Sequence, residues 1–304
     1  MSATQAPTGR PASPPRERIL VLRDGRRMGI CESGDLDQGT PVIFLHGNPG
    51  SRYMRHPDDG LTAGLGVRLI VPDRPGYGLS DGRRERRLLD YPGDITQLAD
   101  QLGLDRFALF GVSAGGPYVA ACAHQIPDRL TGLAIVSGPA PFDRPAREAM
   151  AGVNREYRSA YRLAAWPTWA LWPTIALHDR AVRSSPERAF AAVYAQASAD
   201  DQAVLSDPRI AAQIQGFRAE ASRKGVSGLV REAQILVAPW GFRLQDIRPR
   251  IHLWYWDGDR IVPPQMGRFL QAHIPHTVPH FLPGGGHFSI FSHWAQILTS
   301  LRPD

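Results

Sequence analysis

The sequence predicts an α/β fold, in which a mostly parallel sheet is covered by helices on both faces and interrupted by a helical insertion. Two observations lead to this prediction. Short apolar runs, followed by loops with glycine or proline, alternate with helical patterns in the first half of the chain, as expected for strands buried on both faces. The pattern then changes for about a hundred residues without visible strand alternation, and strand signals return afterwards.

Length and composition are those of an ordinary globular protein. The chain has 304 residues, of which 43% are hydrophobic and 21% charged, so it can bury a large core as one elaborated domain or a domain with an insertion. Residues 1–17 hold four prolines and no apolar run. We expect a disordered tail there, without the apolar stretch of a signal peptide. No later run reaches transmembrane length.

The strands of the first half can be placed in order. Ile19–Leu22 and Met28–Cys31, separated by Asp24-Gly25, predict an opening hairpin. Four further runs are too short and apolar for surface helices, and helical patterns such as 95–102 fall between them. These predicted strands are Val42–Leu45, Arg68–Val71, Phe107–Phe110 and Leu133–Val136.

The insertion is expected to be helical, because alanine, arginine and tryptophan dominate it. Strand signals resume at Ile251–Trp256 and Thr277–Phe281, and a terminal helix is expected near Phe288–Leu301. The predicted organisation is a tail at 1–17, a sheet core at 18–141 and 244–304, and a helical insertion at 142–243.

The charge pattern argues against a nucleic-acid partner. The formal net charge is +6, but the basic residues are scattered, as in 83–87, where four arginines flank Glu85. No aromatic-basic RNA motif or zinc-finger spacing is present. A solvated basic face is the better interpretation, and we expect neither a nucleic-acid nor a membrane partner.

Cysteine usage predicts a reducing compartment. The chain has two cysteines, Cys31 and Cys122. Cys122 lies in an apolar helical segment, where a buried small hydrophobe is expected. We therefore expect a cytoplasmic protein.

A G-x-S-x-G run, Gly111 to Gly115, follows the apolar segment Phe107–Phe110 and precedes a helical pattern. A serine hydroxyl is too weakly acidic to attack a carbonyl unaided, and a strand-to-helix turn can lift it from the sheet beside a base. The small glycines allow the tight turn. Although the run alone is a weak signal, Ser113 is a candidate nucleophile.

Three more segments fall at the carboxyl ends of predicted strands, where open α/β sheets bind ligands. In the first, 46–51, the backbone N–H of Asn48 could face a developing oxyanion with the N–H of Ala114 opposite. The alternative is a tight turn in which Asn48 tolerates an unusual backbone angle. The other two, 256–263 and 283–288, supply carboxylates and His287.

Ser113, Asp259 and His287 could form a triad, in which a carboxylate fixes the tautomer of the histidine and stabilises its positive charge. Their order, serine then aspartate then histidine, is that of the α/β-hydrolases. Asp257 is the rival acid, two residues away.

The combination resembles the cap-bearing α/β-hydrolase superfamily. The segments that carry the resemblance are His46-Gly47-Asn48-Pro49-Gly50, residues 72–80 (PDRPGYGLS), the Ser113 turn, Gly258-Asp259-Arg260-Ile261-Val262-Pro263 and Gly286-His287. The resemblance implies a sheet of about eight strands with a helical cap over the active site. It also favours Asp259, because the family places its acid before Arg-x-Val-Pro. Asp73 and Arg74 are expected to brace loops.

The serine excludes some relatives by chemistry. Dehalogenases and epoxide hydrolases of the superfamily use a carboxylate, because aspartate attack on saturated carbon gives an ester that water cleaves, whereas serine would give a stable ether. The substrate should therefore be a small molecule with an electrophilic carbonyl, such as an ester, thioester, lactone, amide or β-diketone.

The insertion gives weaker clues. Trp166 and Trp169, with Tyr157 and Tyr161 nearby, are packing residues by default, but would make an apolar pocket if they faced Ser113. Three arginines, Arg155, Arg158 and Arg162, could meet a carboxylate, although solvated arginines are the default. No metal is expected, since the histidines His273, His276 and His280 lack a carboxylate motif. No dinucleotide fingerprint follows the first strand, so no cofactor is implied.

We therefore predict a cofactor-free serine hydrolase, most concretely esterase-like, acting through an acyl-Ser113 intermediate. One alternative is a carbon–carbon bond hydrolase, or a biosynthetic lyase or cyclase, that uses the same pocket. Another is a ligand-binding receptor with little turnover. The sequence leaves the oligomeric state and the natural substrate open.

Overall fold

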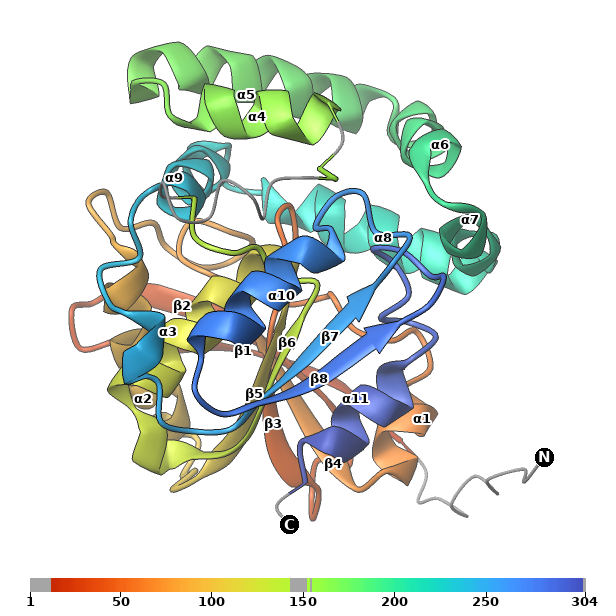
Figure 1. Ribbon diagram of the computed structural model, residues 1–304. Helices are drawn as coiled ribbons and strands as arrows, with labels where there is room; N and C mark the ends of the chain where they lie inside the picture. Colours follow the sequence, from red (N-terminus) through yellow and green to blue (C-terminus); the bar gives the residue numbers. More distant parts are fainter. Residues whose placement is uncertain (1–11, 143–151, 154, 303–304) are drawn as a thin grey trace.

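An eight-stranded sheet forms the centre of the computed structural model, which describes residues 12–142, 152–153 and 155–302 (Figure 1). The strand order across the sheet is β1-β2-β4-β3-β5-β6-β7-β8. The strands are β1 (Ser13–Val21), β2 (Arg27–Gly34), β3 (Thr40–Leu45), β4 (Val67–Pro72), β5 (Phe107–Val112), β6 (Leu130–Val136), β7 (Ile251–Trp256) and β8 (Thr277–Leu282).

Strand β2 pairs antiparallel with both of its neighbours, and the pairs from β4 to β8 are parallel. The predicted fold class and opening hairpin are therefore confirmed. Strand β1 begins at Ser13, so the last part of the tail predicted at 1–17 is strand, paired along β2. Glu17 is fixed there because its carboxylate accepts hydrogen bonds from Arg52 and Tyr53. Residues 1–11 lie outside the described residues.

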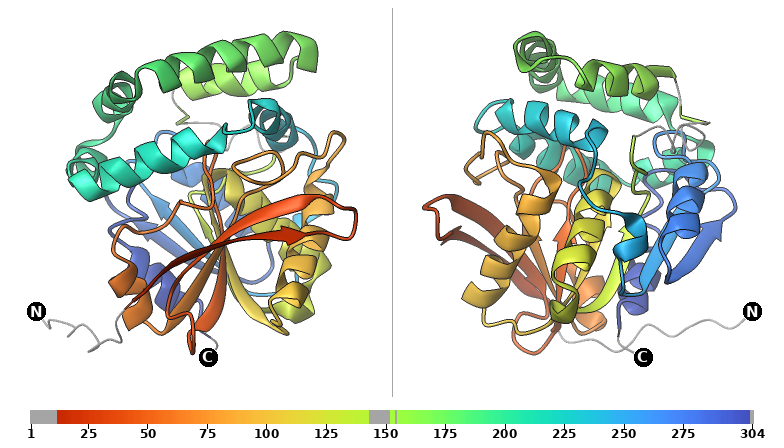
Figure 2. Two further views of the ribbon diagram at one scale, coloured as in Figure 1. Left: turned by 180° about the vertical axis from the view of Figure 1, so that it is seen from behind. Right: turned by 60° about the vertical axis from the view of Figure 1, so that its left-hand side comes forward.

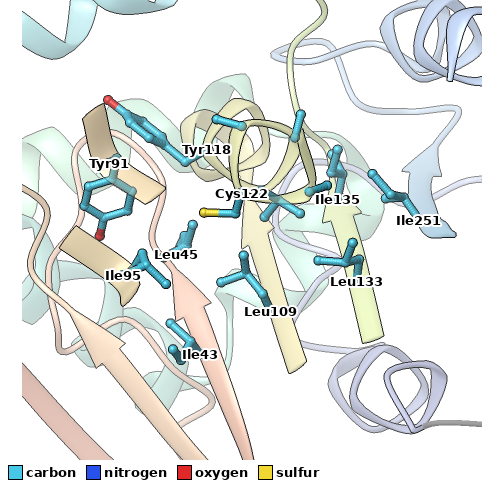
Figure 3. Close-up of a cluster of buried hydrophobic side chains, with 14 of the residues drawn as sticks. Ile43, Leu45, Tyr91, Ile95, Leu109, Tyr118, Cys122, Leu133, Ile135 and Ile251 are labelled. Atoms are coloured by element: carbon cyan, nitrogen blue, oxygen red, sulfur yellow. The ribbon is translucent and has the colours of Figure 1, made fainter. Parts of the chain in front are cut away.

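Helices cover both faces of the sheet (Figure 2). Alternate residues of each strand point to opposite faces, so each face has its own core. The first core packs the sheet against α2 (Tyr91–Gln101), α3 (Gly116–Gln125) and α10 (Pro264–His273). Figure 3 shows part of it, with Cys122 among Leu45, Leu109 and Ile135. Cys122 is fully buried, which confirms its predicted role.

The second core lies on the opposite face. Phe44 and Phe110 stack with ring centroids 4.3 Å apart, and Trp294 meets both edge-on from α11 (Trp294–Ser300). Such aromatic pairs contribute beyond their buried area. Residues of α8 (Pro208–Ala221) join the same cluster, so this core continues from the sheet into the helices of the insertion. Helix α1 (Asp59–Gly64) completes this side of the sheet.

Between β6 and β7, the described residues form six α-helices in a layer over one edge of the sheet, which we call the cap (Figure 1). They fall within the insertion predicted at 142–243, of which residues 143–151 and 154 lie outside the described part. The cap helices are α4 (Arg155–Ala164), α5 (Thr168–Ser184), α6 (Pro186–Gln196), α7 (Ala199–Leu205), α8 (Pro208–Ala221) and α9 (Ser227–Val237). Within the described ranges, no helix combines the length and hydrophobicity needed to cross a membrane.

Parallel strands end at the same edge of a sheet. The segments after β3, β5, β7 and β8 therefore meet at the edge beneath the cap. These segments contain Asn48, Ser113, Asp259 and His287, respectively.

Candidate active site

Ser113 lies at the turn from β5 into α3 and has a φ of 52°. A non-glycine residue rarely adopts this left-handed conformation, and here a three-residue 3-10 turn, 113–115, continues directly into α3. Gly115 is required for space, since a Cβ there would collide with the carbonyl of Leu45 on the neighbouring strand. Gly111 is restricted in the same way by the carbonyl of Gly115. The turn thus packs closely and presents Ser113 at the edge of the sheet.

Asp259, which is buried, pairs with the partly buried His287. His287 Nδ1 lies 2.8 Å from Asp259 Oδ2, to which the hydroxyl of Ser137 also donates at 2.7 Å. The other carboxylate oxygen accepts two backbone N–H groups, from Ile261 and Val262, both at 2.9 Å. Asp259 is 2% exposed, and these donors offset the cost of burying its charge.

Asp257, the rival acid, is exposed, two residues before Asp259. Its N–H bonds to the carbonyl of Leu282. Because Asp259 rather than Asp257 contacts His287, the geometry favours the acid that the sequence favoured.

The surroundings of His287 raise its pKa. Burial lowers the pKa of the imidazole, but the charge and hydrogen bond of Asp259, with the charge of Asp201, more than offset that effect. His287 Nδ1 therefore donates to Asp259, which leaves Nε2 as the basic nitrogen. In the described part of the chain, no hydrogen bond joins His287 to Ser113; such contacts often tighten only when substrate binds.

Asp201, on cap helix α7, is a second carboxylate beside His287, and the sequence analysis missed it. Its Oδ1 accepts the N–H of Phe288 at 2.9 Å. Burial raises the pKa of Asp201 to about 6, against the lowering effects of the Phe288 N–H and of His287. The hydroxyl of Ser198 binds the carbonyl of Gly285 in the same loop. The start of α7 therefore holds the loop that carries His287.

Asn48 lies on the loop after β3, opposite the Ser113 turn. A Cβ on Gly47 would be 3.3 Å from Ser113 Cβ, so the two segments are in close contact. Tyr77, fully buried, donates its hydroxyl to Asn48 Oδ1 at 2.9 Å and fixes the side chain. Among the described residues, no hydrogen bond takes up the N–H of Asn48. The N–H of Ala114 lies in the first turn of a helix, where N–H groups have no partner within the turn.

Asp73 and Arg74 fix these loops, as the sequence suggested. Asp73 accepts hydrogen bonds from the backbone and side chain of Arg52 and from the N–H of Leu79. Burial nevertheless raises the pKa of Asp73 to about 6. Arg74 is fully buried and donates to the carbonyls of Ala114 and Gly47, each at 2.9 Å.

A cavity of about 40 Å³ lies between the cap and His287. Tyr157 lines it together with Ser198, Asp201 and Ile261. Tyr161 packs nearby. Burial raises the pKa of its hydroxyl, and the charges of Tyr157 and Asp259 raise it further. Two of the predicted cap aromatics therefore lie near the Asp259–His287 pair.

The tryptophans lie elsewhere. Trp166 is 50% exposed and Trp169 80% exposed, and neither lines this cavity. A substrate-binding role for them stays a prediction, and their exposure gives it no support. Arg155, Arg158 and Arg162 are exposed as well, as solvated arginines would be.

A second cavity, of about 180 Å³, lies within the cap. It is lined mainly by apolar atoms of α5, α6 and α8, together with the half-buried Arg218. Burial lowers the pKa of Arg218, and the nearby Tyr157 opposes that effect. Tyr157 also lines the cavity beside His287. Arg218 belongs to no motif that the sequence shows.

In the part of the chain that the structure describes, no group of three His, Cys, Asp or Glu side chains is placed to hold a metal ion. Of the three histidines considered from the sequence, His280 stacks on Trp254 and pairs with His252 at 3.0 Å. His273 bonds the carbonyl of Phe269 in its own helix. These contacts are those of packed histidines.

Comparison with known families agrees with this geometry. A model of the alpha/beta hydrolase fold matches residues 40–293, which is most of the chain. The chain belongs to the alpha/beta hydrolase fold family. The resemblance inferred from the motifs is therefore confirmed, and the protein is a member of a hydrolase family.

Relatives by sequence differ in their reactions. Epoxide hydrolase B of Mycobacterium tuberculosis is 34% identical over 125 residues, which span 40% of this chain and 35% of that protein. The chain therefore covers little more than a third of that relative. A 2-hydroxy-6-oxo-6-phenylhexa-2,4-dienoate hydrolase of Burkholderia cepacia is 27% identical over 271 residues, 85% of each chain.

Solved structures resemble the whole chain. The esterase RhEst1 from Rhodococcus sp. ECU1013 has a TM-score of 0.68 at 20% identity and covers 93% of this chain and 97% of its own. The enol-lactonase from Burkholderia xenovorans LB400 has a TM-score of 0.67 at 18% identity, with 93% and 99% covered. At these identities the likeness shows the fold alone.

Proposed function

We propose that this protein is a serine hydrolase that cleaves a small, hydrophobic ester-like substrate through an acyl-Ser113 intermediate. His287 is the general base, Asp259 orients it, and the N–H groups of Asn48 and Ala114 stabilise the oxyanion. The observation that carries the proposal is the Asp259–His287 pair, with its buried carboxylate, at the same sheet edge as Ser113, which has a φ of 52°.

The pair suits its role in charge and tautomer. Asp259 accepts four hydrogen bonds, so its carboxylate stays fixed while His287 takes up and returns a proton. The environment of His287 raises its pKa, which stabilises the imidazolium formed as Ser113 attacks. Asp201 adds a further negative charge on the cap side of the imidazole.

The nucleophile limits the substrate to carbonyl compounds. The partial match to an epoxide hydrolase does not suggest epoxide opening here, since a serine ether could not be hydrolysed at a carbonyl. The second carboxylate near His287, Asp201, is held by the N–H of Phe288 and is not on the nucleophile turn.

Turnover of p-nitrophenyl esters of graded acyl length tests the proposal. The wild type should hydrolyse short or aromatic esters, and Ser113→Ala should abolish turnover. Ser137→Ala is the matched control, because Ser137 also has positive φ, at 44°, and contacts the same carboxylate. Loss of one hydrogen bond to a charged group costs about 1.5–3 kcal/mol, so this variant should retain measurable activity. Equal activity of wild type and Ser113→Ala would refute the proposal.

Arg218 favours a second candidate, a carbon–carbon bond hydrolase acting on a substrate with a carboxylate. A half-buried guanidinium beside an apolar cavity is suited to bind such a group. The dienoate hydrolase that matches 85% of this chain has such a substrate in its name.

The two candidates differ in the effect of Arg218→Gln. If the substrate carries a carboxylate, this variant should raise KM for a 6-oxo-dienoate and leave KM for a neutral p-nitrophenyl ester unchanged. Loss of the dienoate chromophore follows the reaction directly. No turnover of dienoates by the wild type would dismiss this candidate and leave the esterase proposal intact.

A further inference from the structure

Arg74 touches the backbone of both segments that carry the proposed oxyanion donors. Its Nη2 donates to the carbonyl of Gly47 and its Nη1 to the carbonyl of Ala114, both at 2.9 Å. The planar guanidinium offers its donors in a rigid fork. One side chain therefore fixes the spacing between the loop after β3 and the Ser113 turn.

The Gly47 contact sets the direction of the Asn48 N–H. The Gly47 carbonyl and the Asn48 N–H belong to one planar peptide, and in a trans peptide they point in opposite directions. His46 Nε2 accepts the N–H of Arg74, so its Nδ1 carries the proton and donates to the same Gly47 carbonyl at 2.8 Å. With two donors on the carbonyl side, the Asn48 N–H points to the opposite side of its peptide, away from Arg74 and His46.

Arg74 is in turn held by the cap. Glu232 of α9 is fully buried and lies 3.2 Å from Arg74 Nη1. The same carboxylate accepts Arg86 Nη2 at 2.6 Å and the hydroxyl of Tyr118 at 2.9 Å. The ring of Tyr118 also lies under the Arg74 guanidinium, 5.0 Å from its centroid. The position of Arg74 thus depends on a cap helix as well as on the core.

The charges of this cluster do not cancel. Two guanidiniums, those of Arg74 and Arg86, share the single carboxylate of Glu232, which leaves one net positive charge behind the Gly47 and Ala114 carbonyls. A cation on the carbonyl side of a peptide polarises it and strengthens the N–H on the other side as a donor. The Gly47 carbonyl shares its peptide with the Asn48 N–H, so an oxyanion bound to that N–H would be stabilised where water does not screen the field.

We propose that Arg74, anchored by Glu232 of the cap, is the positioning residue of the oxyanion hole: it aligns and polarises the Gly47–Asn48 peptide, whose N–H is one donor, and through the Ala114 carbonyl it fixes the turn that carries the other donor, the Ala114 N–H. This inference rests on the proposed function, because it concerns the same carbonyl chemistry at Ser113.

Phenylboronic acid tests the role, since its boron bonds the serine oxygen while the serine proton passes to His287, and the tetrahedral anion places an oxygen in the hole. Arg74→Met should lower kcat by about 10²–10³-fold, as loss of an oxyanion donor does. The affinity for phenylboronic acid should fall by a similar factor. KM should change by less than about threefold, since ground-state contacts remain. Arg86 and Glu232 would be left as a balanced pair.

Arg52→Met is the matched control. Arg52 is equally buried, at 1% exposed, and pairs with Asp73 and with Glu220 of cap helix α8, but in the described contacts it donates to neither the Gly47 nor the Ala114 carbonyl. It should lower the melting temperature at least as much as Arg74→Met, and change the affinity for phenylboronic acid by less than about threefold.

Arg74→Lys is tested beside them, because it keeps the buried charge for Glu232 but lacks the fork that spans two carbonyls. It should lower kcat and phenylboronic acid affinity by about tenfold while folding normally. A folded Arg74 variant with wild-type kcat and wild-type inhibition would overturn the role of Arg74. So would losses of kcat and of inhibitor affinity that follow the melting temperature in all variants, including Arg52→Met. Either result would leave the proposed function standing. A wild type that neither hydrolyses esters nor binds phenylboronic acid would overturn the proposed function as well.

Discussion

Replacing Asp259 by asparagine should disable the base through its tautomer. Both N–H groups of Ile261 and Val262 point at Asp259 Oδ1, so the amide oxygen of the variant must occupy that position. The amide nitrogen then takes the place of Oδ2, facing His287 Nδ1 at 2.8 Å and Ser137 Oγ at 2.7 Å.

Two donors cannot share one hydrogen bond, so His287 must accept at Nδ1 and carry its proton on Nε2. Nε2 is the nitrogen that should deprotonate Ser113, and it is then no longer basic. The same substitution in a known triad lowers kcat by about 10⁴-fold. At 1.36 kcal/mol for each factor of ten, this is about 5.4 kcal/mol of transition-state stabilisation.

The assay is kcat/KM for a p-nitrophenyl ester as a function of pH. In the wild type, the raised pKa of His287 places the acidic limb of the profile above the ordinary histidine value, because His287 must be neutral to act as a base. Asp257→Asn is the matched control: the position is exposed and two residues away, and activity should be retained. Similar activities for the two variants, or a larger loss in Asp257→Asn, would show that Asp259 does not set the tautomer of His287.

Two further perturbations test the surroundings of the site. Asp201→Asn should move the acidic limb of the kcat/KM profile to lower pH, because the charge of Asp201 raises the pKa of His287. The movement should be smaller than in Asp259→Asn, since Asp259 raises that pKa more. The pKa of Asp201 itself is raised from 3.8 to about 6, so the native state binds more protons between these values and stability falls as pH rises through that window. The difference of about 2.2 between these pKa values corresponds to at most about 3 kcal/mol of stability. Urea unfolding should therefore show a smaller loss of unfolding free energy between pH 4 and pH 7 in Asp201→Asn than in the wild type. An equal loss in the two proteins would contradict a raised pKa at Asp201. Gly115→Ala should lower stability by about 1–3 kcal/mol and should also abolish most of the activity, because the added Cβ would collide with the Leu45 carbonyl. Gly93→Ala has no atom within 4 Å of its added Cβ and should leave both unchanged or slightly improve stability; equal effects at the two glycines would contradict the packing argument.

The sequence was informative where function depends on short motifs at strand ends. The Ser113 turn, Asp259 and His287 each follow a strand that the apolar runs predicted, and parallel pairing brings these ends to one edge. Apolar runs in the sequence are sufficient to locate these strand ends, because strands buried on both faces are nearly continuous apolar runs.

The contacts made by the cap could not be predicted in the same way. Asp201 lies 87 residues from Phe288, and Glu232 lies 146 residues from Arg86. Neither acid belongs to a motif, and a charged residue on a helix is normally expected to face solvent. Only the folded arrangement shows that Glu232 is fully buried against Arg74.

The beginning of the sheet was also misplaced for a physical reason. Residues 13–17 are rich in proline and charge, which is the composition of a disordered tail. The structure pairs them with β2, and Glu17 bonds Arg52 and Tyr53. Edge strands tolerate proline and charge, and long-range ion pairs of this kind leave no local pattern.

Intact-mass measurement after exposure to a fluorophosphonate reports whether Ser113 is an activated nucleophile. Such a probe reacts with a serine only when a base and an oxyanion site activate it. We expect one adduct on the wild type and on Ser137→Ala, mapped to Ser113 by peptide sequencing, and none on Ser113→Ala or His287→Ala. A folded wild type that remains unmodified, or an adduct that persists in Ser113→Ala, would show that Ser113 is not the activated nucleophile.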